Sequence, residues 1–394
     1  MVTCLANVSA GTCWTLRRIV GFDTPTPGAG GTFWAFGNQP AIDRGVVVFE
    51  ASGGGQTGIY RYQAGELTVV ADRNTAVPGT DEYFYGFSRV SIDRGSIAFA
   101  GKPTAEPGMT GVYALIDGEL QRVVDPTTAV PGRSESTDDL RSPCIGGQTV
   151  AFWGKGSDHK EGIYIWRPGQ GVAVVADHDT PVPGITGTFS YLGDQAAVDG
   201  ESVVFYGGRY QERAGIYRDT NGVGSVVCDK STRIPGGSGN FVSFSNPSAD
   251  DGMVAFRGFG DFEQTGIYAH ADGGLVRIAD KGTSMPGGQK FTWFHSQVAI
   301  DGGNVAFVGY GESGSSGLYA RYDGVLGEII DLDDTLEGKS LRELHIGRES
   351  LSGGRVVFRA RFTDDSESLY IATIPEPATV AFLALGGLAV LRRR

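Results

Sequence analysis

Apolar and polar residues alternate along most of the chain in short runs separated by turn residues, a pattern that indicates β-strands rather than helices. The first period contains four such runs, at Phe33 to Phe36, Val46 to Phe49, Gly58 to Arg61 and Leu67 to Val70. The 62 glycines and 17 prolines among 394 residues agree with this pattern. Glycine costs about 1 kcal/mol and proline about 3 kcal/mol in a helix interior. The pattern therefore predicts a packed all-β protein.

Three markers recur along the chain with nearly constant spacing. A Gly-(Ile/Val/Leu)-Tyr triplet, replaced by Ser-Leu-Tyr in its last copy, recurs every 51 or 53 residues, with its tyrosines at Tyr60, Tyr113, Tyr164, Tyr217, Tyr268, Tyr319 and Tyr370. An apolar run that closes on phenylalanine recurs equally often, at Phe49, Phe99, Phe152, Phe205, Phe256, Phe307 and Phe358. The third marker reads Asp-x-x-Thr-x-x-Pro-Gly, as in residues 72–79. Seven periods of four antiparallel strands are typical of a seven-bladed β-propeller.

The two ends of the repeat predict how the ring closes. A fourth strand follows each of the first six tyrosine triplets, but after Tyr370 the chain runs directly into Ile374-Pro375. Arg18 to Val20 stand before the first Thr-x-x-Pro-Gly marker and match the missing strand in type. We therefore expect this N-terminal strand to pair with Ser368 to Ile371 and to complete the seventh blade. An open ring would leave sheet edges that favour aggregation.

Composition excludes several classes of protein. A net charge of −12 and no basic cluster in the body argue against nucleic-acid binding, since phosphate contacts require a basic face. The four cysteines, Cys4, Cys13, Cys144 and Cys228, form no CxxC pair, so no zinc or thioredoxin-like site is indicated. The glycine runs lie between expected strands rather than before helices, and no serine-hydrolase or phosphate-binding motif occurs. We expect no cofactor and no metal site.

The aspartate of the third marker could be interpreted as part of a ring of cation ligands. Its copies are Asp72, Asp125, Asp177, Asp229, Asp280 and Asp331. Equivalent blades would hold these carboxylates far apart, whereas calcium takes six to eight oxygens within about 2.6 Å. We therefore expect the aspartates and threonines to make local turns before Pro-Gly.

Candidate ligand-binding residues are sought where a repeat departs from the common pattern. Trp34 and Trp293 do not recur in most blades, and either core packing or carbohydrate stacking would explain aromatic residues there. The third repeat departs at Glu135, Asp138, Asp139, Asp158, His159, Lys160 and Glu161, and the seventh at Arg342, His345 and Arg348. From these sets we take Trp34, Trp293, Asp138, Asp139 and His159 as candidate binding residues. Solvated loop charges are the alternative for the acidic ones.

The C-terminal residues read IPEPATVAFLALGGLAVLRRR. Pro375-Glu376-Pro377, an apolar run over residues 378–391 and the terminal Arg392, Arg393 and Arg394 together resemble the PEP-CTERM sorting signal of Gram-negative bacteria. The resemblance implies export across the inner membrane, processing by an exosortase-type enzyme and delivery to the cell surface or extracellular matrix.

Physical reasoning about the tail agrees with a transient membrane anchor. Fourteen residues rise about 21 Å as a helix, short of the roughly 30 Å hydrocarbon core. The arginines would hold the C-terminus on the cytoplasmic side. Residues 1–15 carry no early basic residue and no sustained apolar run, so we expect this sequence to begin inside or after the true leader.

The sequence thus predicts three parts: an N-terminal segment (1–17) that is a candidate leader remnant, a propeller (18–373) and a sorting signal (374–394). We expect an exported, non-enzymatic binding or structural module, with extracellular polysaccharide as a candidate ligand. The alternative is a propeller enzyme, a glycosidase or lyase, that acts on such polysaccharide. A pair of carboxylates about 5 to 9.5 Å apart in a cleft would favour a glycosidase.

Overall fold

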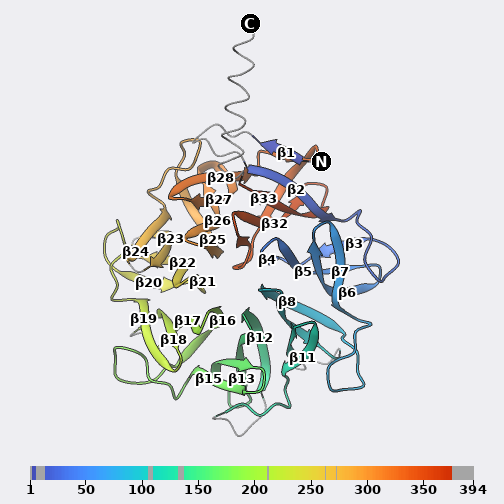
Figure 1. Cartoon of the computed structure of the whole chain (residues 1–394). Coiled ribbons are helices and arrows are strands. Elements are labelled where there is room, and N and C mark those ends of the chain that lie inside the picture. Colours follow the sequence, from blue (N-terminus) through green and yellow to red (C-terminus); the bar gives the residue numbers. More distant parts are fainter. Residues whose placement is uncertain are drawn as a thin grey trace, which may run out of the picture.

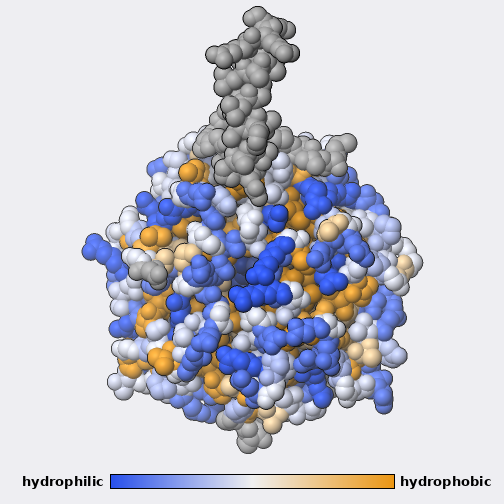
Figure 2. Space-filling view, in the orientation of Figure 1, coloured by the Kyte–Doolittle hydropathy of each residue, from blue (hydrophilic) through white to orange (hydrophobic). Residues whose placement is uncertain are grey.

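The chain folds into seven antiparallel sheets arranged as the blades of a ring (Figure 1). Figure 2 shows hydrophilic and hydrophobic residues interspersed over the same face of the ring. The computed structural model describes residues 2–5, 14–104, 110–131, 137–210, 213–261, 263–271 and 273–374. For residues 2–5, 137, 138 and 313 it describes the backbone alone. The predicted seven-bladed, four-stranded propeller is therefore confirmed.

The first four blades follow one another along the chain. Blade one contains β3 (Phe33–Phe36), β4 (Ala41–Asp43), β5 (Val46–Gly53), β6 (Gln56–Gln63) and β7 (Glu66–Asp72). Blade two contains β8 (Gly86–Asp93), β9 (Ser96–Lys102), β10 (Gly111–Ile116) and β11 (Glu119–Val124). Blade three contains β12 (Thr137–Gly146), β13 (Thr149–Gly156), β14 (Glu161–Arg167) and β15 (Gly171–Asp177). Blade four contains β16 (Tyr191–Asp199), β17 (Ser202–Gly208), β18 (Gly215–Thr220) and β19 (Val223–Asp229).

The last three blades keep the same order, and the final one borrows a strand. Blade five contains β20 (Phe241–Phe244), β21 (Ser248–Asp250), β22 (Met253–Gly260), β23 (Thr265–Ala271) and β24 (Gly274–Asp280). Blade six contains β25 (Phe291–Asp301), β26 (Asn304–Gly311), the short 3-10 helix η1 (Glu312–Gly314), β27 (Ser316–Tyr322) and β28 (Val325–Asp331). Blade seven contains β29 (Thr335–Leu336), β30 (Lys339–His345), β31 (Leu351–Ser352), β32 (Arg355–Phe362), β33 (Glu367–Thr373) and β2 (Trp14–Gly21), with β1 (Val2–Leu5) paired outside β2.

The ring is closed by the N-terminal strand, as predicted. Arg18 pairs with Tyr370, Val20 with Leu369 and Gly21 with Ser368 in an antiparallel register. The strand is longer than the three residues expected from sequence, because it starts at Trp14. Trp14 is buried against the core of the last two blades. The first and last strands of the propeller therefore share one sheet.

The repeat markers form the blade cores. In every blade the marker phenylalanine of the second strand lies opposite the marker tyrosine of the third, as Phe49 does to Tyr60. In blade one these rings lie 5.9 Å apart, and Phe33 of the inner strand meets Tyr60 edge to face at 5.0 Å. The triplet begins with glycine because a Cβ at Gly58 would lie 2.7 Å from the Ala71 carbonyl oxygen. Aromatic pairs of this kind contribute about 0.5 to 1.5 kcal/mol beyond area burial.

The third marker makes a local turn, as expected. The Asp72 backbone N–H donates to Thr75 Oγ1 at 2.9 Å, and the Thr75 hydroxyl donates back to Asp72 Oδ1 at 3.0 Å. The same exchange occurs in the turns at Asp125, Asp177, Asp229 and Asp280. No group of His, Cys, Asp or Glu side chains within the described ranges could hold a metal ion.

Candidate functional site

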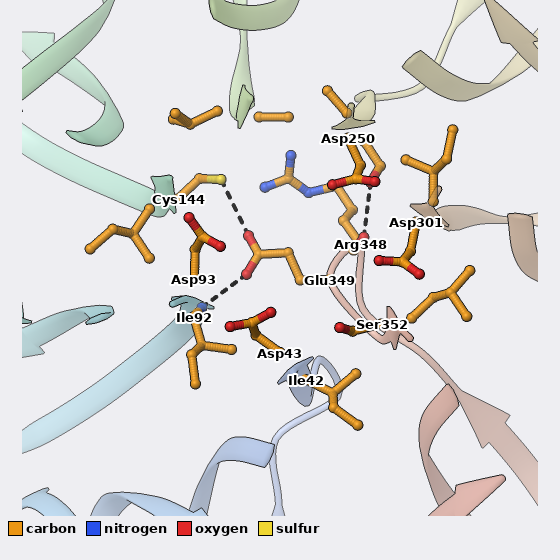
Figure 3. A pocket seen from close by; sticks show the side chains of 17 residues that line it. Ile42, Asp43, Ile92, Asp93, Cys144, Asp250, Asp301, Arg348, Glu349 and Ser352 are labelled. Carbon is orange, nitrogen blue, oxygen red and sulfur yellow. Dashed lines mark hydrogen bonds between the residues drawn. The ribbon is translucent and has the colours of Figure 1, made fainter. Parts of the chain in front are cut away.

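A loop of blade seven occupies the middle of the ring, where the inner strands of all the blades converge. The loop covers residues 346–350, between β30 and β31, and we call it the axial loop. In Figure 3 Arg348 and Glu349 lie at the centre, among side chains that come from the surrounding blades. The loop is fastened to blade one, because the Ile42 N–H donates to the Glu349 carbonyl at 2.8 Å and the Ser350 hydroxyl donates to the Pro40 carbonyl at 2.6 Å.

Glu349 extends from the axial loop to blades two and three. Its Oε1 accepts hydrogen bonds from Ser91 Oγ at 2.9 Å and from the Cys144 thiol at 3.2 Å. Its Oε2 accepts from the Ile92 backbone N–H at 3.1 Å. Burial raises the pKa of the Glu349 carboxyl, although neighbouring Arg348 and these donors favour the ionised form. The three donors account for the presence of a carboxyl group at a buried position.

Arg348 extends in the opposite direction, to blades four and five. Its Nη1 donates to the Ala196 carbonyl at 2.8 Å and to the Pro247 carbonyl at 3.0 Å. Its own carbonyl accepts from Ser248 Oγ at 2.9 Å. The axial loop thus connects blade seven to blades one to five through hydrogen bonds. These contacts stabilise the centre of the ring.

A belt of hydrogen bonds joins neighbouring blades at the ends of their inner strands. An aspartate at the end of one inner strand accepts from a backbone N–H in the following blade, as Asp250 does from Gly302 at 2.8 Å and Asp301 from Gly353 at 2.9 Å. The same contact uses Asp43, Asp93 and Asp199, and Ser352 takes the aspartate's place between blades seven and one. Burial raises the pKa of Asp43, Asp250 and Asp301.

Blade three lacks this aspartate and has Gly146 in its place. A Cβ at Gly146 would lie 2.6 Å from Val198 Cγ1, so an apolar contact replaces the hydrogen bond at this junction. A cavity of about 100 Å³ lies between the belt and the axial loop. Because the carboxylates that line it are engaged with backbone N–H groups, we interpret this cavity as part of the scaffold.

The opposite ends of the inner strands carry an exposed aromatic group between blades five and six. The Arg257 guanidinium lies over the rings of Phe259, at 4.7 Å, and Trp293, at 5.2 Å. Arg257 Nη1 also donates to the Phe294 carbonyl at 2.7 Å, which fixes the cation in place. The Trp293 side chain is 46% exposed. We call Arg257, Phe259 and Trp293 the Trp293 platform.

Two histidines lie beside this platform, where blades six and seven meet. The rings of His295 and His345 are 6.0 Å apart and perpendicular. Burial, and the neighbouring cations Arg257 and Arg359, lower the pKa of both imidazoles. His345 Nε2 lies 3.3 Å from Glu343 Oε2. The lowered pKa favours the neutral form of both rings. In that form His295 Nδ1 already accepts from the Gln297 N–H at 3.3 Å, which leaves Nε2 to donate, and the contact of His345 Nε2 with Glu343 leaves Nδ1 to accept.

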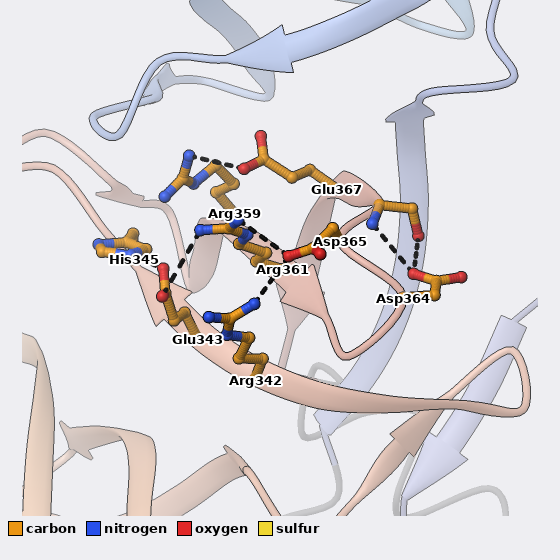
Figure 4. Close-up of polar contacts among 9 residues, drawn as sticks. Arg342, Glu343, His345, Arg359, Arg361, Asp364, Asp365 and Glu367 are labelled. Atoms are coloured by element: carbon orange, nitrogen blue, oxygen red, sulfur yellow. Dashed lines mark hydrogen bonds and ion pairs between the residues drawn. The ribbon is translucent and has the colours of Figure 1, made fainter.

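A network of arginines and carboxylates fastens blade seven to blade one (Figure 4). Buried Arg359 pairs with Glu367 at 3.1 Å and donates to the Phe36 carbonyl at 3.2 Å. Glu367 in turn accepts from the Phe36 N–H at 3.2 Å. At the edge of the network, Arg342 and Arg361 both bind Asp365 Oδ1. The Arg359–Glu367 pair therefore stabilises the contact between blades seven and one, whereas the contacts of Arg342 and Arg361 with Asp365 stabilise blade seven itself.

The structure places the predicted binding residues on three blades and does not gather them into one site. Trp34 lies on β3 of blade one and is 63% exposed, whereas Trp293 lies on blade six. Asp139 pairs with Arg141 on blade three, and His159 lies exposed in the turn after β13. The Asp138 side chain and the sorting residues Pro375, Glu376, Pro377, Arg392, Arg393 and Arg394 lie outside the described part of the chain. Their roles stay predictions.

Sequence reasoning missed two residues that shape these surfaces, Arg257 and Glu349. Arg257 occupies the position after the marker phenylalanine, where other blades have residues as different as Ala100, Trp153 and Val308. This variability could be seen in the sequence, and it indicates that the position does not serve the packing that all blades share. The partners of Glu349 lie more than 200 residues away in the sequence, so only its three-dimensional contacts reveal its role.

The fold and the tail define the protein as a seven-bladed β-propeller that carries a sorting signal. Residues 373–394 match the PEP-CTERM protein-sorting motif, which confirms the resemblance and indicates export to the cell surface. Residues 10–344 match a family of unknown function, DUF7453, and the chain belongs to that family. A search among curated proteins finds no match.

Several solved structures are similar to this chain at low sequence identity. A puromycin hydrolase is 12% identical with a TM-score of 0.51, and the match covers 87% of this chain and 54% of the hydrolase. The β-propeller domain of the Trilobed protease from Pyrococcus furiosus is 14% identical with a TM-score of 0.40, and the match covers 77% of this chain and all of that domain. AofleA from Arthrobotrys oligospora is 12% identical with a TM-score of 0.38, and the match covers 82% of this chain and 92% of AofleA. These likenesses concern the fold alone.

No helix within the described residues, which end at Ile374, is long and apolar enough to cross a membrane.

Proposed function

We propose that this protein is displayed at the cell surface, where its propeller binds extracellular polysaccharide through the Trp293 platform. The observation that carries the proposal is the half-exposed Trp293 ring, held in place by Arg257 and Phe259. Tryptophan is enriched at binding interfaces, because its ring offers a large apolar face together with an indole N–H donor. A platform that is already ordered loses little entropy when it binds.

The chemistry around the platform suits a sugar chain. The apolar faces of sugar rings can pack on Trp293, and the neutral His295 and His345 can exchange hydrogen bonds with hydroxyl groups. Trp34 on blade one offers a further exposed ring.

The tail supplies the route to the surface. We infer that residues 378–391 anchor the chain transiently in the inner membrane and that an exosortase-type enzyme then removes the tail. Replacing Pro375-Glu376-Pro377 with three alanines should leave a membrane-bound form that retains the tail in a host with this enzyme. Intact-mass measurement and cell fractionation test this inference, and unchanged processing would contradict it.

Binding is tested with protein recovered from the surface of such a host. Wild type, Trp293→Ala and the control Tyr210→Ala are mixed with insoluble matrix polysaccharide, and the bound fraction is measured after centrifugation. Tyr210 is a matched control because it is an exposed aromatic residue on blade four. We expect Trp293→Ala to lose at least tenfold in affinity while Tyr210→Ala binds normally. Equal binding by all three proteins would contradict the platform's role, and release of reducing ends would favour the alternative enzymatic function.

A further inference from the structure

A second pocket lies between blades one and two, apart from the Trp293 platform. Its volume is about 230 Å³, and its polar lining comprises Asn38, Gln39, Glu50, Ser88 and Arg89. Glu50 follows the marker Phe49 on β5, and Arg89 is the extra residue of a bulge in β8. Pockets for drug-sized ligands measure about 300 to 1,000 Å³, so this pocket suits one small molecule.

Glu50 departs from the chemistry of the repeat. In blades five and seven the equivalent residues, Arg257 and Arg359, each donate to a carbonyl on the inner strand of the next blade. An ionised carboxyl cannot donate in this way. Within the described ranges, no side chain and no backbone N–H donates a hydrogen bond to the Glu50 carboxyl either. The backbone of Gly37 lies against it, since a Cβ at Gly37 would be 3.2 Å from Glu50 Oε2.

Arg89 is the charged group that faces Glu50 from the neighbouring blade, and its Nη1 donates to Gln39 Oε1 at 3.2 Å. The segment 37–40 adds the uncharged amides of Asn38 and Gln39. Burial raises the pKa of Glu50 to about 7, partly offset by the charge of Arg89. The carboxyl is thus poorly solvated and lacks a donor, while the space in front of it is open.

We propose that this pocket binds one neutral sugar ring, with adjacent hydroxyl groups donating to Glu50 and a further sugar oxygen accepting from Arg89. Charge favours this class of ligand. A cation would be repelled by Arg89 and an anion by Glu50, whereas a polyol supplies donors and acceptors without net charge. The site does not depend on the Trp293 platform or on the proposed polysaccharide binding.

The test is saturation-transfer NMR on the full-length protein with glucose, galactose and mannose as separate probes. We expect at least one of these hexoses to bind the wild type. Glu50→Gln should weaken that binding at least tenfold, because the substitution replaces one acceptor oxygen with an NH2 donor and removes the negative charge, so one of the two hydroxyl groups loses its acceptor. Gly37→Ala should weaken it as well, because the added methyl group lies against the carboxyl. Tyr210→Ala, which changes an exposed aromatic residue outside both sites, should bind the hexose normally.

A second measurement keeps the test independent of variant folding. Hydroxyl donors stabilise the ionised carboxyl, so hexose should lower the pKa of Glu50, followed by carboxyl-carbon NMR in wild-type protein. No hexose binding at millimolar concentration, equal binding by Glu50→Gln, or preferential binding of glucosamine or glucuronate would each overturn the proposal.

Discussion

The thiol of Cys144 in blade three donates to the carboxyl of Glu349 in blade seven, across 205 residues of sequence. Burial raises the pKa of Cys144, so the thiol stays protonated and keeps its role as a donor. This contact lies on the axis of the ring, where the axial loop also binds Ser91 and Ile92 of blade two. Blades far apart along the chain are thereby stabilised as one unit.

Glu349→Ala is expected to lower the free energy of unfolding by about 2 to 4 kcal/mol. The change leaves the Ile92 N–H and two side-chain donors without their acceptor, and an unsatisfied buried group costs about 1 to 3 kcal/mol. Denaturant unfolding measures the effect. Glu66→Ala, which removes an exposed carboxylate from blade one, is the control and should be nearly silent. Equal losses for the two variants would show that the axial loop does not stabilise the ring.

Removal of residues 1–22 should lower the unfolding midpoint and promote association. The truncation deletes β2, exposes the edge of β33 and removes the buried side chains of Trp14, Leu16 and Val20. Burying each such side chain contributes about 1.5 to 3 kcal/mol. Thermal unfolding and light scattering at matched concentration measure both effects. Removal of residues 1–13 alone, which spares β2, should have a small effect. Similar behaviour of the two truncations would contradict closure by the N-terminal strand.

The fold could be predicted because each blade repeats the same strand pairing and the same aromatic packing. The marker phenylalanine and tyrosine of each blade lie opposite each other on its second and third strands, so their recurrence predicted the blades. The missing fourth strand after Tyr370 pointed to Arg18 to Val20. The aspartate-threonine turns could be predicted for the same reason, since they involve residues three apart.

The axial loop and the two candidate binding surfaces could not be predicted in this way. Arg348 was recognised as a departure from the repeat, but its partners, Ala196 and Pro247, are more than 100 residues away. The environment of Glu50 depends on how closely two blades pack, which the pattern of residues does not report. Repetition therefore predicts the scaffold, whereas long-range packing determines the sites.

Glu50 should make stability depend on pH in the neutral range. Its pKa is about 7 in the folded protein and near 4.5 when unfolded, so the folded state binds more protons between these values. The free energy of unfolding therefore falls as pH rises from about 4.5 to about 7, by roughly 2 to 3 kcal/mol from this group.

Glu50→Gln removes that contribution. Urea unfolding of both proteins at pH 5 and pH 8 should show a smaller loss for the variant. Other carboxyls with raised pKa values, such as Asp250 and Asp301, are present in both proteins, so the difference isolates Glu50. Parallel pH dependence of the two proteins would show that Glu50 does not titrate in this range.

The central claim, that the propeller binds polysaccharide through the Trp293 platform, is tested most directly by the tryptophan fluorescence of the protein during titration with soluble matrix oligosaccharides. A sugar ring stacked on Trp293 changes the polarity around this half-exposed indole, and Trp34 serves as the comparison because it is more exposed and lies on another blade. We predict a saturable fluorescence change that persists in Trp34→Phe and is lost, together with at least tenfold in affinity, in Trp293→Phe. An unchanged signal and affinity in Trp293→Phe would contradict the claim.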